Sequence, residues 1–186
     1  MEYEFVKVEK RDHISIVTIN RPEVYNAVHP PLSLELDQVW NEFIEDSEQW
    51  VAVLTGAGDK AFSAGNDLKY SAQPGKYKVQ QPKSGFAGLT NRFDRTKPII
   101  AAVNGFAMGG GMETALSCDI ILASENAKFA LPEVKVGFFA AAGGVQRLSR
   151  QIGKKAALEM ILTGRSVDAA EALKLGIINE VFPQAE

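Results

Sequence analysis

Short apolar runs at three places constrain the fold of this chain more than any other feature of its sequence. They read VAVLTG at 51–56, PIIAAVNG at 98–105 and DIILAS at 119–124. The second run is apolar without alternation, which is typical of a strand buried on both faces. Segments with the period of a helix alternate with these runs, and this order predicts an α/β domain with a largely parallel sheet. In such sheets ligands gather at the carboxyl ends of the strands, beside helix N-termini.

The remaining sequence divides into short elements. An amphipathic helix is predicted near 31–47 by apolar residues at i, i+3, i+4 and i+7, namely Leu36, Val39, Trp40 and Phe43. Further helices are expected at 85–95, behind the glycines at 109–111, at 143–164 with a break near Gly153, and at 168–176. A hairpin is expected at 4–19, with its turn at Lys10–Asp12. Extended structure is also expected at 128–137 and at 177–182. The segment 71–84 has no apolar period and is expected to form a mobile loop that carries Lys76, Lys78 and Lys83.

Composition and charge exclude several classes of protein. The chain has 186 residues, of which 46% are hydrophobic, and this suits one domain with a sizeable core. The net charge of −3 gives no basic surface for nucleic acid, and no apolar run has the length of a membrane span. The single cysteine, Cys118, and an N-terminus unlike a signal peptide predict a cytoplasmic protein. No metal site is expected, because His13 and His29 lie far from any cysteine pair.

Three consecutive glycines, Gly109–Gly111, precede a segment that otherwise has the pattern of a helix. Glycine is a poor helix former, so close packing of the helix against a strand is one explanation. The other is a ligand that approaches the free N–H groups of the first helical turn. Either a phosphate or a carbonyl oxygen that gains negative charge would be stabilised there. The glycines alone do not choose between these two ligands.

Two glutamates favour the carbonyl. Glu113 lies in the first turn of the glycine helix and Glu133 follows Pro132, although each alone is more often a surface acid. A carboxylate one turn beyond an anion site repels phosphate but suits a neutral carbonyl substrate that must exchange a proton. The pair therefore favours acyl chemistry. The small-residue turn AFSAGND at 61–67 is either the source of a second N–H donor or an ordinary tight turn.

Two other enzyme classes fit the sequence less well. Gly56, Gly58 and Ala61 match the spacing of a dinucleotide-binding turn. The acidic residue that would hold the ribose about 20 positions further on is missing, because 68–93 contains no aspartate or glutamate. No serine lies in a G-x-S-x-G turn, which argues against a serine hydrolase.

Several longer stretches of the chain match the signature sequences of one protein family. The stretches are NGFAMGGGMETALSCDIILASENAKFALPEVKVG (104–137), GGVQRL (143–148), ILTG (161–164), AFSAGNDLK (61–69) and RPEVYNA (21–27). Together they closely resemble the enoyl-CoA hydratase (crotonase) family, over about Val6 to Val181. The resemblance implies a crotonase-like spiral of ββα units and reversible hydration of a 2-enoyl-CoA to a 3-hydroxyacyl-CoA. GFAGLT (85–90) and FALPE (129–133) look particularly like the carnitinyl-CoA dehydratase branch.

The resemblance also implies roles for individual residues. The two N–H donors of the oxyanion hole fall on Asn66 and Gly110, and the two catalytic acids on Glu113 and Glu133. Relatives that only isomerise double bonds usually keep one acid, at the position of Glu133, so two acids favour hydration. Contacts with the substrate or its CoA are expected from Ala61, Ser63, Ala64, Asp67, Leu68 and Gly109, and the loop lysines could meet the CoA phosphates. No separate cofactor is expected, because coenzyme A is part of the substrate.

Two departures from the family pattern bear on function. Family members usually have proline at the position of Ala140, which borders the acyl pocket. The family also continues beyond the end of this sequence into helices that help to form trimers. We therefore expect 1–186 to be a truncated crotonase core whose full-length form is a homo-oligomer, a trimer or a dimer of trimers. The alternatives are a carnitinyl-CoA dehydratase, an enoyl-CoA isomerase, an inactive acyl-CoA-binding fragment and a nucleotide-binding oxidoreductase.

Overall fold

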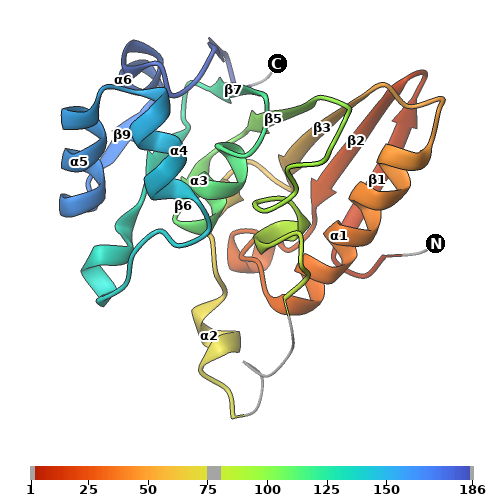
Figure 1. Ribbon diagram of the computed structural model, residues 1–186, viewed down its shortest axis with the longest axis horizontal. Helices are drawn as coiled ribbons and strands as arrows, with labels where there is room; N and C mark the ends of the chain where they lie inside the picture. Colours follow the sequence, from red (N-terminus) through yellow and green to blue (C-terminus); the bar gives the residue numbers. More distant parts are fainter. Residues whose placement is uncertain (1–2, 75–80, 185–186) are drawn as a thin grey trace.

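Two β-sheets form the frame of the molecule (Figure 1). The computed structural model describes residues 3–74 and 81–184. The larger sheet has six strands, in the order β1 (Val6–Arg11), β2 (Ile14–Ile19), β3 (Val51–Gly56), β5 (Ile99–Val103), β7 (Ile120–Ser124) and β10 (Glu180–Phe182). The smaller sheet has four, in the order β4 (Ala61–Ser63), β6 (Phe106–Met108), β8 (Lys128–Ala130) and β9 (Ser166–Asp168).

Parallel pairing dominates both sheets, as the apolar runs predict. Only the β1–β2 hairpin and the β8–β9 pair are antiparallel among the described strands. Successive strands enter the larger and then the smaller sheet, first β3 and β4, then β5 and β6, then β7 and β8. A helical segment follows each pair, so the chain winds as a spiral of ββα units. The expected fold class is therefore confirmed.

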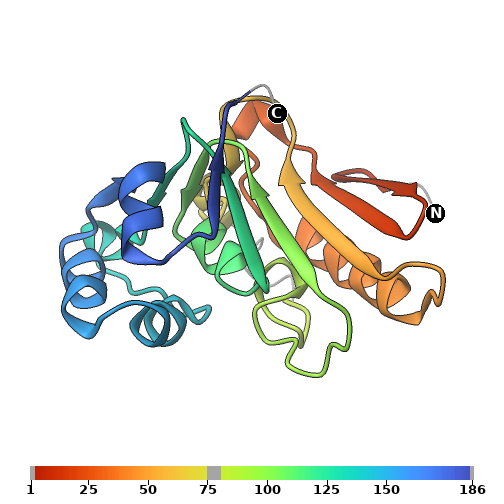
Figure 2. The ribbon, with the colours of Figure 1, turned by 90° about the horizontal axis from the view of Figure 1, so that it is seen from above.

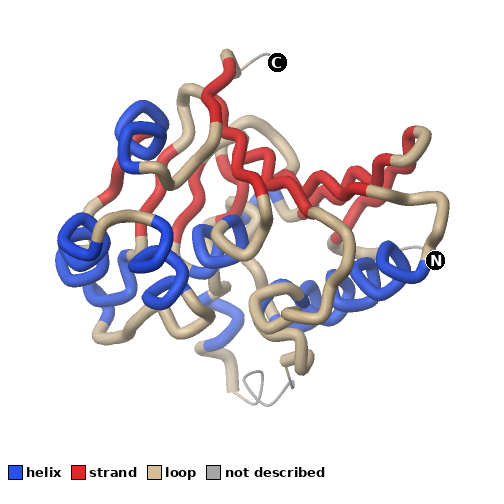
Figure 3. The backbone as a smooth tube through the Cα atoms, turned by 45° about the horizontal axis from the view of Figure 1, so that its top comes forward, coloured by secondary structure: helices blue, strands red, loops and turns tan. Residues whose placement is uncertain are grey.

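Helices pack on the core side of the sheets (Figures 2 and 3). They are α1 (Pro30–Glu45), α2 (Leu68–Ser71), α3 (Gly110–Ala115), α4 (Gly144–Gln151), α5 (Lys154–Thr163) and α6 (Ala169–Leu175), with 3₁₀ turns at Pro22–Val24, Phe86–Gly88 and Pro132–Val136. Helix α1 buries the predicted apolar face of Leu36, Val39, Trp40 and Phe43. Full burial of such side chains contributes roughly 1.5–3 kcal/mol each.

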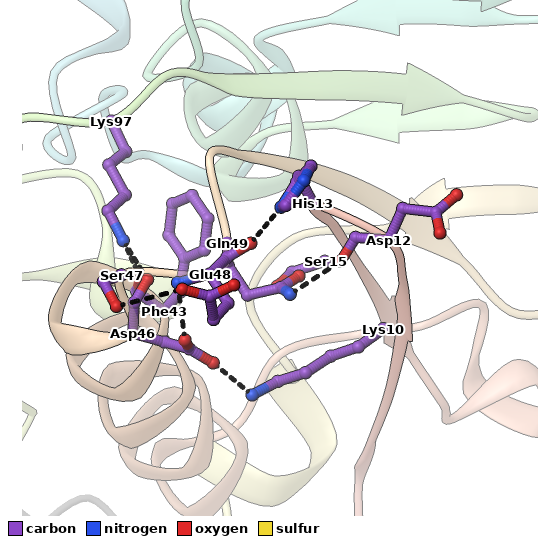
Figure 4. A network of polar contacts seen from close by, with 10 residues as sticks. All are labelled: Lys10, Asp12, His13, Ser15, Phe43, Asp46, Ser47, Glu48, Gln49 and Lys97. Carbon is purple, nitrogen blue, oxygen red and sulfur yellow. Dashed lines mark hydrogen bonds and ion pairs between the residues drawn. The ribbon is translucent and has the colours of Figure 1, made fainter.

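Polar contacts fix the connection between α1 and β3 (Figure 4). Lys97 Nζ, just before β5, donates hydrogen bonds to the carbonyls of Phe43 and Asp46 at 2.8 and 2.5 Å. A cation at this place satisfies carbonyls that the end of the helix leaves without an N–H partner. The buried Gln49 joins the same connection to the hairpin, because its Oε1 accepts from Ser15 Oγ and its Nε2 donates to the carbonyl of Asp12. These contacts set where β3 and β5 begin in the sheet.

The prediction of a helix at 85–95 is wrong. Only Phe86–Gly88 form a short 3₁₀ turn, in which Ala87 has φ of 53° and Gly88 has φ of 64°. Helix α1 imposes this turn, because Trp40 Nε1 donates to the carbonyl of Ala87 at 3.1 Å and Ser33 Oγ accepts from its N–H at 3.3 Å. The left-handed backbone conformation at Ala87 and Gly88 cannot continue a right-handed helix.

Three elements of the smaller sheet were also not expected. Strands β4, β6 and β9 have three residues each, which is too short for a periodic pattern to reveal. The segment 128–137 is extended only in β8 and then forms the 3₁₀ turn Pro132–Val136. The other predicted elements are present, including the break between α4 and α5 at Gly153. Among the described residues, no helix combines the length and the apolar character needed to cross a bilayer.

Candidate active site

The turns that follow β4 and β6 lie against each other. Because β4 and β6 are parallel neighbours, their carboxyl ends meet at one edge of the smaller sheet. A methyl group added to Gly65, in the first turn, would lie only 2.9 Å from Gly110 N in the second. Among the described residues, neither the Asn66 N–H nor the Gly110 N–H donates a hydrogen bond to a protein acceptor. Both donors are therefore available for a ligand.

The three consecutive glycines each exclude a side chain for a different reason. Gly109 has φ of 54°, and a methyl group there would lie 3.0 Å from Glu133 Oε1. A methyl group on Gly110 would lie 2.7 Å from the ring of Phe86. One on Gly111 would collide with the carbonyl of Ser63 in β4. Close packing thus explains Gly111 fully, whereas Gly109 and Gly110 border the space beside the free N–H groups.

Glu113 is buried and held by a second helix. Its side chain extends from the first turn of α3, and Oε1 accepts a hydrogen bond of 2.8 Å from the Gly144 N–H at the start of α4. The Glu113 residue is only 4% exposed. Burial raises the pKa of Glu113 to about 7, although hydrogen bonds from the Gly144 and Ala142 backbone oppose the shift. The carboxyl group can therefore exchange a proton near neutral pH.

Glu133 lies beside the same glycine turn. It lies in the 3₁₀ turn after β8, with its carboxylate beside Gly109. Glu133 Oε2 is buried and has no hydrogen-bond partner among the described residues. Burial raises the pKa of Glu133, and its negative charge in turn raises the pKa of Glu113. An unpartnered buried carboxylate oxygen is unfavourable in a purely structural role.

Two carboxyl groups with raised pKa values can act as a general acid and a general base in the same reaction. Because burial raises the pKa of both acids and the charge of Glu133 raises that of Glu113 further, one can hold a proton while the other is ionised near neutrality. Both lie beside a helix start whose N–H groups can stabilise negative charge on an oxygen. This arrangement suits a carbonyl compound that gains or loses a proton next to its carbonyl carbon.

Comparisons with known proteins agree with this chemistry. Residues 9–186 match the family model described as enoyl-CoA hydratase/isomerase. The chain belongs to the enoyl-CoA hydratase/isomerase family. It is 47% identical to a carnitinyl-CoA dehydratase of Citrobacter koseri, over 90% of this chain and 64% of that protein. It is 44% identical to one of Escherichia coli K12, over 98% of this chain and 70% of that protein.

Solved structures of the same family superimpose closely. A carnitinyl-CoA dehydratase from Mycobacterium avium 104 has a TM-score of 0.91 at 45% identity, over 97% of this chain and 70% of that one. An enoyl-CoA hydratase from Mycobacterium tuberculosis H37Rv has a TM-score of 0.88 at 39% identity, over 97% of this chain and 69% of that one. The chain thus spans about two thirds of the length of these relatives.

The expected CoA-binding residues divide into buried and accessible ones. Ala61 and Ser63 are buried in β4, and Ser63 Oγ donates to the carbonyl of Asn26 at 2.8 Å. Asp67 is 8% exposed and forms a salt bridge of 2.9 Å with Arg21 Nη1. Ala64 and Leu68 are exposed beside them. Direct contact with CoA remains a prediction for all of these residues and for Gly109, and Ala64 and Leu68 are the ones with exposed side chains.

Other sequence expectations have mixed outcomes. Lys76 and Lys78, with the rest of 75–80 in the expected mobile loop, lie outside the described residues, whereas Lys83 is exposed. His29 caps the start of α1, because its Nδ1 accepts a hydrogen bond from the Leu32 N–H. Burial raises the pKa of the Cys118 thiol to about 12, so it is unreactive, as a packed core residue should be.

Three functional features were not found from the sequence. They are the Gly144 N–H that holds Glu113, the Phe86 ring over Gly110, and the packing of the Ala140 methyl group near Gly144, at the position already noted as a departure from the family. Ala140 is 2% exposed, so the family departure at this position lies directly beside the support of Glu113. The glycine pair 143–144 before a helix was the available signal for the first feature, because it repeats the pattern at 109–111.

Replacement of Glu113 by Gln should stabilise the protein at high pH. The folded-state pKa of about 7 lies above the ordinary 4.5, so the stabilising contribution of the protonated acid is full below pH 4.5 and is lost as pH rises to 7. Above that range the buried carboxylate destabilises the fold. The unfolding free energy of Glu113→Gln minus that of wild type should therefore rise by about 1–2 kcal/mol between pH 5 and pH 8.

Urea unfolding at both pH values measures this difference. The exposed Glu125→Gln is the matched control for loss of one negative charge. If Glu113→Gln gained no more stability with pH than Glu125→Gln, the raised pKa of Glu113 would be wrong.

Proposed function

We propose that this chain is the catalytic core of a hydro-lyase that reversibly adds water to a 2-enoyl-CoA thioester, forming a 3-hydroxyacyl-CoA. The observation that carries the proposal is a pair of glutamates, the buried Glu113 and the half-buried Glu133 with its buried Oε2, at a glycine turn with free N–H groups. Family membership supports it, because relatives are named enoyl-CoA hydratase and carnitinyl-CoA dehydratase.

The thioester oxygen would lie between the N–H groups of Asn66 and Gly110. As water attacks the β carbon, electrons move toward the thioester and the oxygen gains negative charge. Two preorganised N–H donors at a helix start stabilise that charge more than they stabilise the ground state. A side chain on Gly109 or Gly110 would collide with Glu133 or Phe86, which border the same turn.

The two acids would share the proton movements. Glu113, as carboxylate, takes a proton from the attacking water while the oxygen of that water bonds to the β carbon. Glu133, as carboxylic acid, gives a proton to the α carbon. The product has gained one H and one OH, so the reaction balances without a redox partner or a cofactor apart from CoA in the substrate. The free Oε2 of Glu133 is the oxygen available for the substrate.

Crotonobetainyl-CoA is the favoured second candidate substrate. Relatives named carnitinyl-CoA dehydratase reach 44–47% identity, against 39% for the enoyl-CoA hydratase of M. tuberculosis H37Rv. The two reactions use the same acids and differ only in the group beyond the β carbon. The ratio of kcat/KM for crotonobetainyl-CoA and crotonyl-CoA decides between the substrates.

Substitution of either acid tests the mechanism. Glu113→Gln and Glu133→Gln should each lower kcat for hydration by roughly 10²–10⁴-fold, with little change in the Kd of the CoA ester, because each removes a general acid or base. The spectrophotometric hydration assay and binding of the ester provide the two readouts. Exposed Glu125→Gln is again the control.

Other outcomes identify the alternatives. Near-normal hydration by either glutamine variant would make that carboxylate structural and refute the two-acid mechanism. Activity that survives loss of Glu113 and shifts double bonds would favour an isomerase. A wild-type protein that binds CoA esters without turning them over would be an acyl-CoA-binding fragment.

We also propose that the chain acts as a homo-oligomer. The structure has an exposed apolar surface, which we define as Val136, Phe138, Phe139, Leu158 and Leu162. Helix α5 buries Ala157 and Met160 but leaves Leu162 66% exposed, and Phe138 and Phe139 are 67% and 63% exposed. Clustered exposed side chains of this size are typical of an interaction surface. Cys118, the single cysteine, forms no disulfide, which suits a reducing compartment such as the cytoplasm.

Light scattering with multi-angle detection tests this second proposal. Wild type should associate, and the double variant Phe139→Glu and Leu162→Glu should shift toward monomer, because it places charges in the contact. Trp50→Glu changes an exposed aromatic elsewhere and should leave the assembly unchanged. A stable wild-type monomer at micromolar concentration would contradict the proposal.

A further inference from the structure

Arg147 bonds to two segments that border the candidate site. It is on the first turns of α4, three residues after Gly144, whose N–H holds Glu113. Its Nη1 donates to the carbonyl of Ala142 at 3.2 Å, and its Nη2 donates to the carbonyl of Thr90 at 2.7 Å. One guanidinium thus joins the turn before α4 to the segment that contains Phe86.

Neighbouring residues leave room for the Arg147 guanidinium and pack against it. Gly143 has φ of 101°, and any side chain there would collide with Arg147 Nη1. The guanidinium lies 5.7 Å from the centre of the Phe93 ring, and Thr90 is 1% exposed. A planar guanidinium can bond two separate carbonyls at once because its donors have a fixed fork geometry.

No described carboxylate forms a salt bridge with Arg147. The charged and titratable groups that act on it are Glu113 from α3, Arg95 and Cys118. Arg95 is itself bonded twice to Asp119, so it does not neutralise Glu113. A half-buried arginine that bonds only neutral carbonyls is unusual for a purely structural cation, because burial of a charge without an ionic partner is unfavourable.

We propose that Arg147 is a positioning residue that clamps the carbonyls of Ala142 and Thr90 and so keeps the support of Glu113 aligned with the Phe86 segment over Gly110. The proposal rests on the proposed hydratase function. Without the clamp, the Gly144 N–H and the ring over Gly110 can move independently. The water held by Glu113 and the thioester held by Gly110 would then lose their alignment.

The positive charge has a second effect at the same site. It lowers the pKa of Glu113 and so opposes burial and the charge of Glu133, which raise it. Loss of the cation should therefore raise the pKa of Glu113. A residue that only stabilised the fold would change the melting temperature without changing this titration.

The test compares Arg147→Met with Arg150→Met. Arg150 lies one turn further along α4, is exposed, and donates only to the carbonyl of Gln146, so it is a matched control. In Arg147→Met the ascending limb of kcat against pH should move to higher pH, and kcat at neutral pH should fall about ten-fold or more with little change in KM. Arg150→Met should retain the wild-type profile.

A direct titration separates this proposal from the proposed function. Carboxyl ¹³C NMR of glutamate-labelled protein, with Glu113→Gln to assign the signal, measures the pKa of Glu113 without any turnover. A higher pKa in Arg147→Met supports the effect of the Arg147 charge on Glu113, and an unchanged pKa in the folded variant overturns that effect, whereas kcat of Arg147→Lys tests the clamp itself. A wild type that hydrates no enoyl-CoA would instead refute the proposed function, while the titration still decides the effect of Arg147 on Glu113.

Arg147→Lys keeps the test decisive if the methionine variant does not fold. Lysine preserves the charge, but its single ammonium cannot bond both carbonyls in the arginine geometry. Its Glu113 pKa should stay close to that of wild type while kcat falls. Wild-type kcat in a folded Arg147→Lys would refute the two-carbonyl clamp.

Discussion

The close approach of Gly111 to the carbonyl of Ser63 is the contact on which the rest of the site depends. It lets α3 begin directly against β4, so that the turn after β4 and the turn after β6 meet. The N–H groups of Asn66 and Gly110 become neighbours only because of that approach. A β carbon at Gly111 would push the helix away from the strand and separate the two donors. The spiral of ββα units supplies the two parallel strands that make this contact possible.

The same geometry explains why the two acids are energetically unfavourable for the fold. Glu113 and Glu133 both lie at the glycine turn, and no cation among the described residues forms a salt bridge with either. Burial disfavours their ionised forms, so each has a raised pKa. A protein that needed only stability would place uncharged residues there. Apolar burial along α1 and in the two sheets compensates for this local loss.

Sequence patterns revealed the parts of the molecule that repeat with a period. The face of α1 and strands β3, β5 and β7 are long enough for their apolar spacing to be distinctive. The two acids were also accessible to sequence reasoning as a pair, because together with the glycine-rich helix start they favoured acyl chemistry, although each alone is more often a surface acid. The roles of Asn66 and Gly110 came only from the family resemblance and remain predictions.

Features that depend on tertiary contacts could not be predicted in this way. The positive φ of Ala87 is imposed by Trp40 and Ser33, which are about fifty residues away in the sequence. Strands of three residues have no period, so the smaller sheet was not visible. The Gly144 hydrogen bond to Glu113 joins α4 to α3, and no local pattern specifies which helix start will support a distant acid.

A crystal structure of the protein with a bound 3-hydroxyacyl-CoA tests the central claim most directly. The thioester oxygen should lie about 3 Å from both Asn66 N and Gly110 N, which is the distance of an oxyanion-hole hydrogen bond. The 3-hydroxyl group should contact Glu113, and the α carbon should face Glu133 Oε2. A thioester bound elsewhere, or one with neither N–H within hydrogen-bond distance, would contradict the account.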